Sequence, residues 1–348
     1  MTTTPVLSIG SPTGTFEAGS IELRDLREDD VRIDVKFAGI CHSDIHQVRE
    51  EWGDSIFPMV PGHEIAGVVA EIGGAVTRVK VGDHVGVGCM VDSCGECEFC
   101  KEGFEQHCTK GAVMTYNGVD YHDENTKGGY AQGVVVAERF VLTIPEGLGL
   151  DVAAPLLCAG VTTYSPLRRW GAGPGSKVAV IGMGGLGHMG VKIAAAMGAE
   201  VTVLSRTTDK EADSREFGAS LHLATTDEQV FADHEGYFDI ILNTVSADLP
   251  MEDYVALLKP RGALVNVGLP PAKYEVTPAA LIATSKVLAG SQIGGIPETQ
   301  EMLDFCAKHD FGATVEVIGA DEVDKAYDTV VDGKVRYRYV IDTSTISG

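Results

Sequence analysis

The sequence predicts an α/β chain with two domains: a β-rich domain, folded as a partly open barrel or sandwich, and a doubly wound parallel sheet. A chain of 348 residues with 44% apolar content is long enough to build two cores. Its first part is rich in Val, Ile and Gly, and strand patterns alternate with helix patterns after about residue 155. We therefore expect one domain at 1–154 and 296–348, and the other at 155–295.

The β-rich part extends from about Ile21 to Pro145. Alternation of apolar and polar residues, together with enrichment in Val and Ile, predicts its strands. We expect them at 31–40, 64–73 and 82–91. Gly-Gly and Gly-Asp pairs between these segments mark turns. A four-cysteine lobe at about 90–110 interrupts this pattern as an insertion.

The second part alternates between buried strands and helices. Short apolar runs predict strands at 176–182, 201–206, 238–245, 262–268 and 286–293. Helix patterns follow the first two of these strands, the second of them at 211–218. Such alternation with short connections is typical of a parallel sheet covered on both faces. An amphipathic helix at 298–310 and a strand at 336–342 complete the chain.

Charge and composition exclude several classes of partner. The chain has 27 basic and 50 acidic residues, a net charge of −23, so it should repel nucleic-acid phosphates and anionic lipids. The N-terminus lacks the basic and apolar regions of a secretory signal, and no apolar run reaches transmembrane length. We expect a soluble, cytoplasmic protein with neither nucleic-acid nor membrane partners.

Four cysteines form the most specific motif in the chain, with the spacing C-x2-C-x2-C-x7-C. They are Cys94, Cys97, Cys100 and Cys108. Four thiolates in one short loop suit tetrahedral zinc, and such a closed site is structural because no coordination position remains for a substrate. A chance group of buried thiols and an iron–sulfur cluster are the alternatives. The usual cluster motif has other spacing and a proline after its last cysteine, whereas Thr109 follows here.

A glycine motif, G-x-G-x-x-G, follows the strand predicted at 176–182. It comprises Gly182, Gly184 and Gly187, with Gly185 and Leu186 inside it. Between a strand and a helix, these glycines permit a tight turn and close approach of a pyrophosphate to the helix N-terminus. In this position the motif predicts a dinucleotide site. The alternative is a tight strand–helix turn without a ligand.

The end of the next strand favours NADP(H) over NAD(H). An NAD site usually has Asp or Glu here to bind the ribose 2′-hydroxyl. This chain has Ser205 and Arg206, with Lys210 about one helical turn further on. A hydroxyl and two cations suit a 2′-phosphate. The alternative is that Arg206 and Lys210 are solvated surface charges.

A second metal site is predicted from donors scattered along the chain. They are Cys41, His63, Glu64 and Cys158. Two thiolates and an imidazole, with a fourth position left for water, form a catalytic zinc site. Each residue alone would more simply be a core residue. The two remaining cysteines, Cys89 and Cys306, are expected to be buried as small apolar residues.

Taken in order, these motifs resemble those of the zinc-dependent medium-chain alcohol dehydrogenases, most closely the cinnamyl-alcohol-dehydrogenase-like branch. The resemblance covers essentially the whole chain. It is carried by GICHSD, FPMVPGHEIAGVV, the four-cysteine run, LLCAGVTTYSPL, GMGGLGHMGVKIA and the terminal RYRYV. It implies a GroES-like catalytic domain with a zinc lobe and a Rossmann domain.

The resemblance also implies roles for individual residues. Cys41, His63 and Cys158 match the catalytic zinc ligands, with Glu64 as an alternate ligand. Ser43 matches the hydroxyl that binds the substrate oxygen, and His46 the outer member of the proton relay. Asp44 matches the carboxylate that orients His63, and Thr162 a position beside the nicotinamide. Trp52 and Met90 match walls of the substrate pocket.

The implied activity is hydride transfer between NADP(H) and a primary alcohol or aldehyde, including aromatic or allylic ones. Two zinc ions per chain and a homodimer are expected, with a tetramer as the alternative. An NAD-dependent polyol or sugar dehydrogenase would more naturally have an acidic residue at position 205. A zinc-stabilised binding protein without catalysis would not need the Ser43 and His46 pair. The segment 116–132 fits a family loop to which we assign no role.

Overall fold

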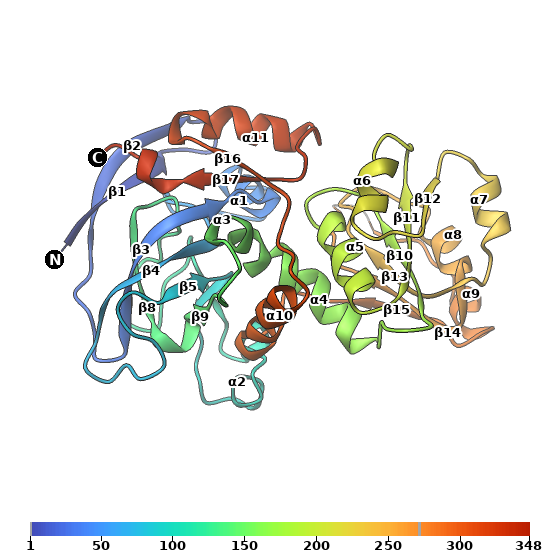
Figure 1. Ribbon diagram of the computed structural model, residues 1–348, viewed down its shortest axis with the longest axis horizontal. Helices are drawn as coiled ribbons and strands as arrows, with labels where there is room; N and C mark the ends of the chain where they lie inside the picture. Colours follow the sequence, from blue (N-terminus) through green and yellow to red (C-terminus); the bar gives the residue numbers. More distant parts are fainter. Residues whose placement is uncertain (1, 271–272) are drawn as a thin grey trace. The chain divides into compact units, whose positions relative to one another are not determined.

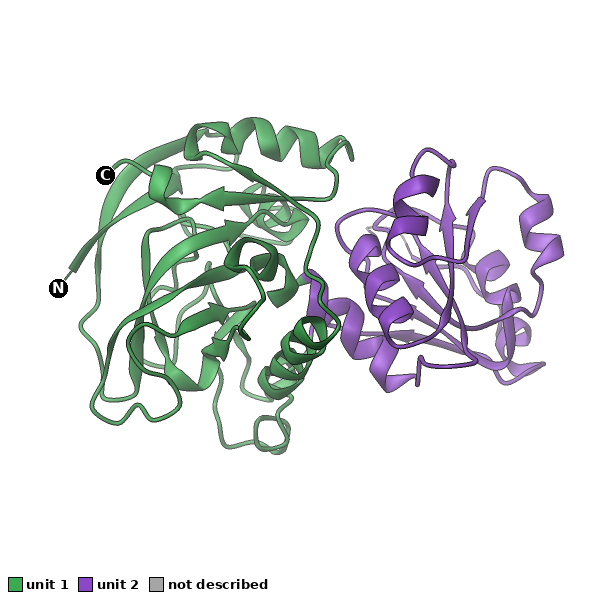
Figure 2. Cartoon of the chain, in the orientation of Figure 1, with its two compact units in different colours: residues 1–158, 294–348 green, residues 159–293 purple. Residues whose placement is uncertain are grey.

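The structure is a computed structural model that describes residues 2–270 and 273–348. It comprises two compact units, residues 1–158 with 294–348 and residues 159–293 (Figures 1 and 2). The first unit is discontinuous, because the C-terminal segment returns to it after the second unit. No helix within the described ranges has both the length and the apolar character needed to cross a membrane.

The first unit is built on a sheet whose central strand is β3 (Asp30–Gly39). β3 pairs antiparallel with β4 (Ile65–Ile72), β8 (Gly133–Ala137) and β17 (Arg338–Asp342). The sheet also contains β5 (His84–Val87), β9 (Leu142–Thr143) and β16 (Val315–Ile318). Since β17 comes from the end of the chain, this sheet joins the N-terminal and C-terminal segments.

Residue alternation explains why β3 forms where it was predicted. Val31, Ile33 and Val35 are buried, whereas the residues between them are partly exposed. The strand predicted at 64–73 corresponds to β4. The segment predicted at 82–91 is divided between β5 and a short strand, β6 (Met90–Asp92), which pairs with β7 (Val113–Met114).

Two strands at the N-terminus were not expected from the sequence. They are β1 (Thr2–Ile9) and β2 (Phe16–Leu23), which form an antiparallel two-stranded sheet. Val6, Leu7 and Ile9 are buried, and all three belong to the main apolar cluster of this unit. This hairpin therefore forms part of the core.

The helices of the first unit are short, apart from two near the C-terminus. The short ones are α1 (His42–Val48), α2 (Glu98–Lys101) and α3 (Leu150–Ala153), with 3₁₀ turns η1 (Glu105–His107), η2 (Glu138–Phe140), η3 (Ala154–Leu157), η4 (Ala320–Glu322) and η5 (Thr343–Thr345). The longer ones are α10 (Ile296–Lys308) and α11 (Val323–Val331). α10 corresponds to the helix predicted at 298–310, and its apolar side buries Met302, Leu303 and Cys306.

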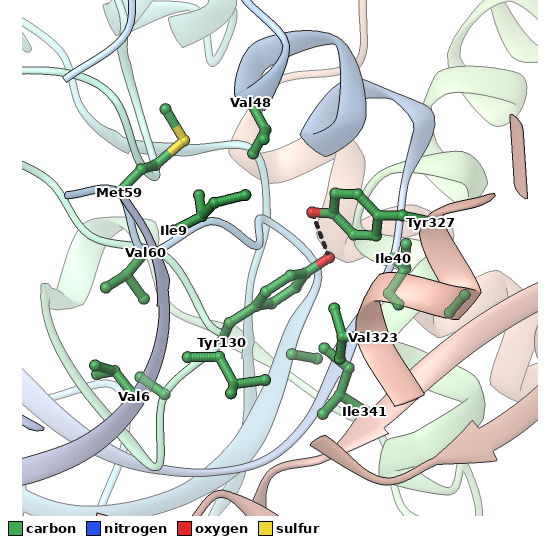
Figure 3. Packing of buried hydrophobic residues seen from close by; sticks show 14 of the residues in the cluster. Val6, Ile9, Ile40, Val48, Met59, Val60, Tyr130, Val323, Tyr327 and Ile341 are labelled. Carbon is green, nitrogen blue, oxygen red and sulfur yellow. Dashed lines mark hydrogen bonds between the residues drawn. The ribbon is translucent and has the colours of Figure 1, made fainter. Parts of the chain in front are cut away.

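The main core of the first unit lies between the N-terminal hairpin, α1 and α11 (Figure 3). It contains buried tyrosines as well as aliphatic residues. The hydroxyls of Tyr130 and Tyr327 are 3.3 Å apart and form a hydrogen bond (Figure 3). A buried hydroxyl needs such a partner, because leaving it unsatisfied would cost stability.

Within the described residues, the second unit has a parallel six-stranded sheet of order β12-β11-β10-β13-β14-β15. The strands are β10 (Lys177–Ile181), β11 (Glu200–Ser205), β12 (Leu221–Ala224), β13 (Phe238–Asn243), β14 (Leu258–Asn266) and β15 (Val287–Gly290). The helices are α4 (Ala159–Arg169), α5 (Gly187–Ala196), α6 (Glu211–Glu216), α7 (Gln229–Asp233), α8 (Met251–Ala256) and α9 (Pro278–Ile282), and they lie on both sides of the sheet (Figure 1).

The strand order of this sheet indicates where a ligand would bind. The chain builds outward from β10 through β11 to β12, then returns to β13 on the other side of β10. In doubly wound sheets, ligands bind at the carboxyl ends of the strands where the order reverses. Here that position lies between β10 and β13, directly beside the glycine motif.

Candidate functional site

The scattered metal-donor residues converge in the first unit. β3 and β4 are antiparallel neighbours in which Ala38 pairs with Ile65. Residues just after β3 and just before β4 must therefore lie at the same end of the pair, and these are Cys41 and His63. The donor atoms of Cys41, His63, Glu64 and Cys158 all lie within 4.8 Å of one another, and all four residues are buried.

Asp44, in the first turn of α1, holds both sides of this donor cluster. One of its carboxylate oxygens accepts a hydrogen bond from the backbone N–H of Cys41 at 2.9 Å. The other lies 2.9 Å from Nδ1 of His63 and also accepts from the Gly62 N–H. A carboxylate bound to Nδ1 leaves Nε2 of the imidazole available as a ligand. Although burial opposes it, Asp44 raises the pKa of His63 well above its usual value.

Glu64 presents an unsatisfied oxygen to the cluster. One carboxylate oxygen is paired with the guanidinium of Arg338, a buried residue on β17. The other, Oε2, is buried and has no hydrogen-bond partner among the described residues. Burial raises the pKa of Glu64 to about 7. A Cβ on Gly39 would lie 2.0 Å from Oε2, so only glycine permits this carboxylate its position.

Hydrogen bonds connect the thiols of the cluster. The hydrogen bond with Cys158 lowers the pKa of Cys41 well below its usual value. Hydrogen bonds with Cys41 and Cys89 raise the pKa of Cys158. Two thiols crowded with an imidazole and an unsatisfied carboxylate oxygen suit a soft divalent cation, which binds thiolates and displaces their protons. The donor set therefore fits zinc.

Cys89 was expected to be a simple buried residue. It is buried, but it also lies against the donor cluster, since it hydrogen-bonds Cys158 and its Sγ lies 3.9 Å from the Leu157 carbonyl oxygen. Its spacing from the other cysteines gave no indication of this. Cys306 is fully buried on α10, as expected.

The predicted relay residues lie on α1, next to the donor cluster. Ser43 Oγ is 3.6 Å from Cys41 Sγ. His46, one turn further along, stacks on Trp52 with ring centroids 4.9 Å apart. Its Nδ1 contacts a carboxylate oxygen of Glu51, which the sequence did not identify. Glu51 follows another glutamate just beyond α1, and only the structure distinguishes the two.

The two predicted pocket residues have different environments. Trp52 is 46% exposed and covers one face of His46. Met90 is buried on β6, opposite Met114 of β7. The structure alone does not assign a substrate contact to either residue, so both remain predictions.

The four-cysteine lobe has the dimensions of a closed metal site. Its four sulfurs lie within 4.8 Å of one another, with Cys97 and Cys100 at 3.5 Å and Cys94 and Cys100 at 3.9 Å. A tetrahedron with Zn–S bonds of about 2.3 Å places its sulfurs about 3.8 Å apart. The four cysteines are thiols rather than disulfides, as a zinc site requires. Backbone hydrogen bonds, the largest from Thr109, lower the pKa of Cys97 to about 6.

The segment 116–132 is attached to this lobe. Tyr121 donates its backbone N–H to Asp92 at 3.0 Å and its hydroxyl to the Gly111 carbonyl oxygen at 2.8 Å. Asp92 also pairs with Arg139, which donates to the carbonyl oxygen of Ser93 at 2.7 Å. These contacts hold both ends of the cysteine run against the sheet, a role that the sequence did not indicate.

The glycine motif forms the turn between β10 and α5 in the second unit. Gly182 has φ +89°, and a Cβ on Gly187 would lie 2.2 Å from the Gly182 carbonyl oxygen, so packing within the chain requires both glycines. Gly184 differs, because a Cβ there would meet nothing within 4 Å among the described residues. Open space beside the backbone at the N-terminus of a ten-residue helix fits a bound pyrophosphate. Gly185 and Leu186 complete the turn.

The predicted cofactor-selecting residues follow β11. Ser205 ends the strand, Arg206 is exposed beside it, and Lys210 directs its ammonium to the Met183 carbonyl oxygen at 2.9 Å. Lys210 therefore lies next to the glycine turn, where a cofactor phosphate would bind. Thr162 is buried on α4 of this unit.

Two family models match the chain. One, described as the alcohol dehydrogenase GroES-like domain, covers residues 27–146. The other, described as the zinc-binding dehydrogenase, covers residues 185–308. Together they span most of both units.

Several known proteins are similar over nearly the whole chain. The probable formaldehyde dehydrogenase AdhA of Bacillus subtilis is 56% identical over 99% of this chain and 98% of its own. NADP-dependent alcohol dehydrogenase C 1 of Mycolicibacterium smegmatis is 55% identical over 99% of both. The structure of a Sorghum bicolor cinnamyl alcohol dehydrogenase superposes with TM-score 0.95 at 42% identity over 99% of both chains. The structure of the CAD from Helicobacter pylori, complexed with NADP(H), superposes with TM-score 0.92 at 41% sequence identity, also over 99% of both chains.

These similarities confirm the predicted fold class, a GroES-like domain joined to a doubly wound parallel sheet. They also confirm the resemblance that the motifs carried, including its cinnamyl-alcohol-dehydrogenase branch. The chain is an oxidoreductase that belongs to the zinc-binding alcohol dehydrogenase family.

Proposed function

We propose that this chain is an NADP(H)-dependent alcohol dehydrogenase that reduces aldehydes, including aromatic and allylic ones, and oxidises the corresponding primary alcohols. The observation that carries the proposal is the buried cluster of two thiols, an imidazole and an unsatisfied carboxylate oxygen. Two cysteines and a histidine form the ligand set of catalytic zinc in alcohol dehydrogenases. We assign Cys41, His63 and Cys158 as ligands and Glu64 as an alternate ligand.

The residues on α1 then account for substrate binding and proton movement. Zinc, when bound, polarises the substrate oxygen, and NADPH supplies the hydride. The Ser43 hydroxyl, close to Cys41 Sγ, hydrogen-bonds that oxygen. His46 carries the proton between Ser43 and solvent, inward when an aldehyde is reduced and outward when an alcohol is oxidised. Glu51 contacts His46 at the half-exposed end of this relay. Asp44 keeps His63 in the tautomer that presents Nε2.

The second unit supplies the cofactor site. The turn at 182–187 receives the pyrophosphate, where open space beside Gly184 supports the assignment. Ser205, Arg206 and Lys210 bind the 2′-phosphate, and Thr162 lies beside the nicotinamide. NADP dependence of the Mycolicibacterium smegmatis relative supports this choice of cofactor. Trp52 and Met90 are proposed as walls of the substrate pocket.

The proposal is tested by assaying cinnamaldehyde, benzaldehyde and short aliphatic aldehydes with NADPH and with NADH. We expect reduction of the aromatic and allylic aldehydes with NADPH and much slower turnover with NADH. Ser205→Asp should lower the ratio of NADPH activity to NADH activity by about tenfold or more, because a carboxylate beside the 2′-phosphate adds like-charge repulsion. Ser220→Asp, at an exposed position just before β12 and so at the opposite end of the strands, is the matched control and should leave the preference unchanged.

Two results would contradict these assignments. Absence of hydride transfer with every aldehyde and both cofactors, in protein that binds two zinc ions per chain, would leave the binding-protein alternative. A cofactor preference unaltered by Ser205→Asp would remove Ser205 from the 2′-phosphate site.

The chain is further proposed to act as a cytoplasmic homodimer. Among the described residues, β15 pairs only with β14 and leaves a free sheet edge. Ile282 and Leu269 on this unit are 76% and 64% exposed, more than a soluble monomer favours for large apolar side chains. Sedimentation equilibrium should give twice the mass of one chain. Four times that mass would indicate the tetramer instead, and a monomer would contradict both.

A further inference from the structure

Tyr116 is a buried tyrosine beside the donor cluster that has no part in the mechanism above. It follows β7 and is 7% exposed. The preceding residue, Thr115, anchors this segment: its backbone N–H donates to the Cys89 carbonyl oxygen at 3.1 Å, and its hydroxyl donates to that of Gly88. The position of the tyrosine is therefore set by the segment between β5 and β6.

The Tyr116 side chain contacts both segments that carry metal donors. Its hydroxyl donates to the backbone carbonyl oxygen of Ser43 at 3.3 Å. Its ring lies against the imidazole of His63, with centroids 6.0 Å apart and an interplanar angle of 30°. One rigid side chain thus spans the first turn of α1 and the segment before β4.

We propose that Tyr116 is a positioning residue for hydride transfer, which fixes the first turn of α1 against the His63 imidazole. The inference rests on the proposed function, in which the Ser43 hydroxyl binds the substrate oxygen beside the metal ligands. The carboxylate of Asp44 also joins these two segments, because it accepts a hydrogen bond from the backbone N–H of Cys41 and binds Nδ1 of His63. Tyr116 adds a contact to the backbone of Ser43 itself, and small displacements of a reacting group are known to cost rate.

The first test replaces Tyr116 by phenylalanine, which removes the hydroxyl and keeps the ring. We expect kcat for aldehyde reduction to fall about fivefold, roughly the effect of one net hydrogen bond. The KM for NADPH and the content of two zinc ions should not change. The matched control is Tyr327→Phe, which removes a buried hydroxyl and its 3.3 Å bond to Tyr130 in the same core (Figure 3). It should lose similar stability without loss of kcat.

The second test needs no turnover and so does not depend on the proposed activity. Tyr116→Leu removes the ring from His63, and in protein loaded with Co²⁺ it should shift the visible absorption bands of the cobalt bound by the His63 cluster. Tyr327→Leu should leave those bands in place. If wild-type protein reduces no aldehyde, the proposed function fails. The cobalt spectra would still show whether Tyr116 positions the His63 imidazole.

Two outcomes would overturn the inference. One is a kcat for Tyr116→Phe that does not fall more than that of Tyr327→Phe, because the Tyr116 hydroxyl would then have no specific effect on hydride transfer. The other is an unchanged cobalt spectrum in Tyr116→Leu.

Discussion

Replacing Cys41 by serine should lower the zinc content from about two ions to about one per chain and abolish nearly all turnover. The change removes one of the three ligands that we propose for this zinc, which are Cys41, His63 and Cys158. Stabilisation of charge on the substrate oxygen is worth several kcal/mol, so kcat/KM for aldehyde reduction should fall by about 10³-fold or more. Zinc is measured by mass spectrometry, and turnover by oxidation of NADPH.

Cys306→Ala is the matched control for this variant. Cys306 is also a fully buried cysteine, but it lies on α10 with its sulfur 3.7 Å from that of Met302. It should keep two zinc ions and full turnover, with a modest loss of stability from the lost sulfur. Full activity of Cys41→Ser would show that the donor cluster is not the catalytic centre.

Of the substitutions considered, Cys97→Ser should cause the largest fall in thermal stability. A structural zinc site contributes its binding energy to folding, about 10–16 kcal/mol in small peptides, and loss of one ligand forfeits much of it. We expect one zinc ion to be lost and Tm to fall by on the order of 10 °C. Tm is followed by circular dichroism alongside the zinc content.

The remaining turnover separates this variant from Cys41→Ser. Since Cys97 lies outside the donor cluster, protein kept well below its new Tm should still reduce aldehydes. The same Cys306→Ala control applies. A Tm equal to that of the wild type, with one zinc ion lost, would mean that the lobe is stable without metal. Two ions retained would remove Cys97 from the ligand set.

Local patterns predicted strands such as β3 and the four-cysteine group, whereas the roles of the scattered donors Cys41, His63 and Cys158 were implied by the family resemblance. β3 follows from the alternation of Val31, Ile33 and Val35, and the four-cysteine lobe from spacing within one loop. The helix α11 has a pattern that could have been recognised, since Val323, Ala326, Tyr327 and Val330 are buried at helical spacing. No helix was predicted there. The β1–β2 hairpin is harder to predict, because Pro5 interrupts the strand pattern of β1.

The supporting residues of the site could not be predicted, for a different reason. Arg338 is 274 residues from Glu64 in the chain, and Tyr116 is 73 residues from Ser43. Their contacts depend on which strands and segments become neighbours, and no local pattern reports this. Cysteine and histidine stand out in a sequence as candidate metal ligands. An arginine, a glutamate or a tyrosine that supports them cannot be distinguished in the sequence from other residues of the same type.

The return of the C-terminal segment to the central sheet affects the order of folding during synthesis. β3 completes its pairing only when β17 arrives, and Arg338 reaches Glu64 only with that strand. Residues 159–293 hold all the strands of their own sheet by the time they leave the ribosome, whereas the first unit must wait for 294–348. The second unit should therefore complete its sheet first. The ion pair between Glu64 and Arg338, beside the donor cluster, should form only after β17 has been made.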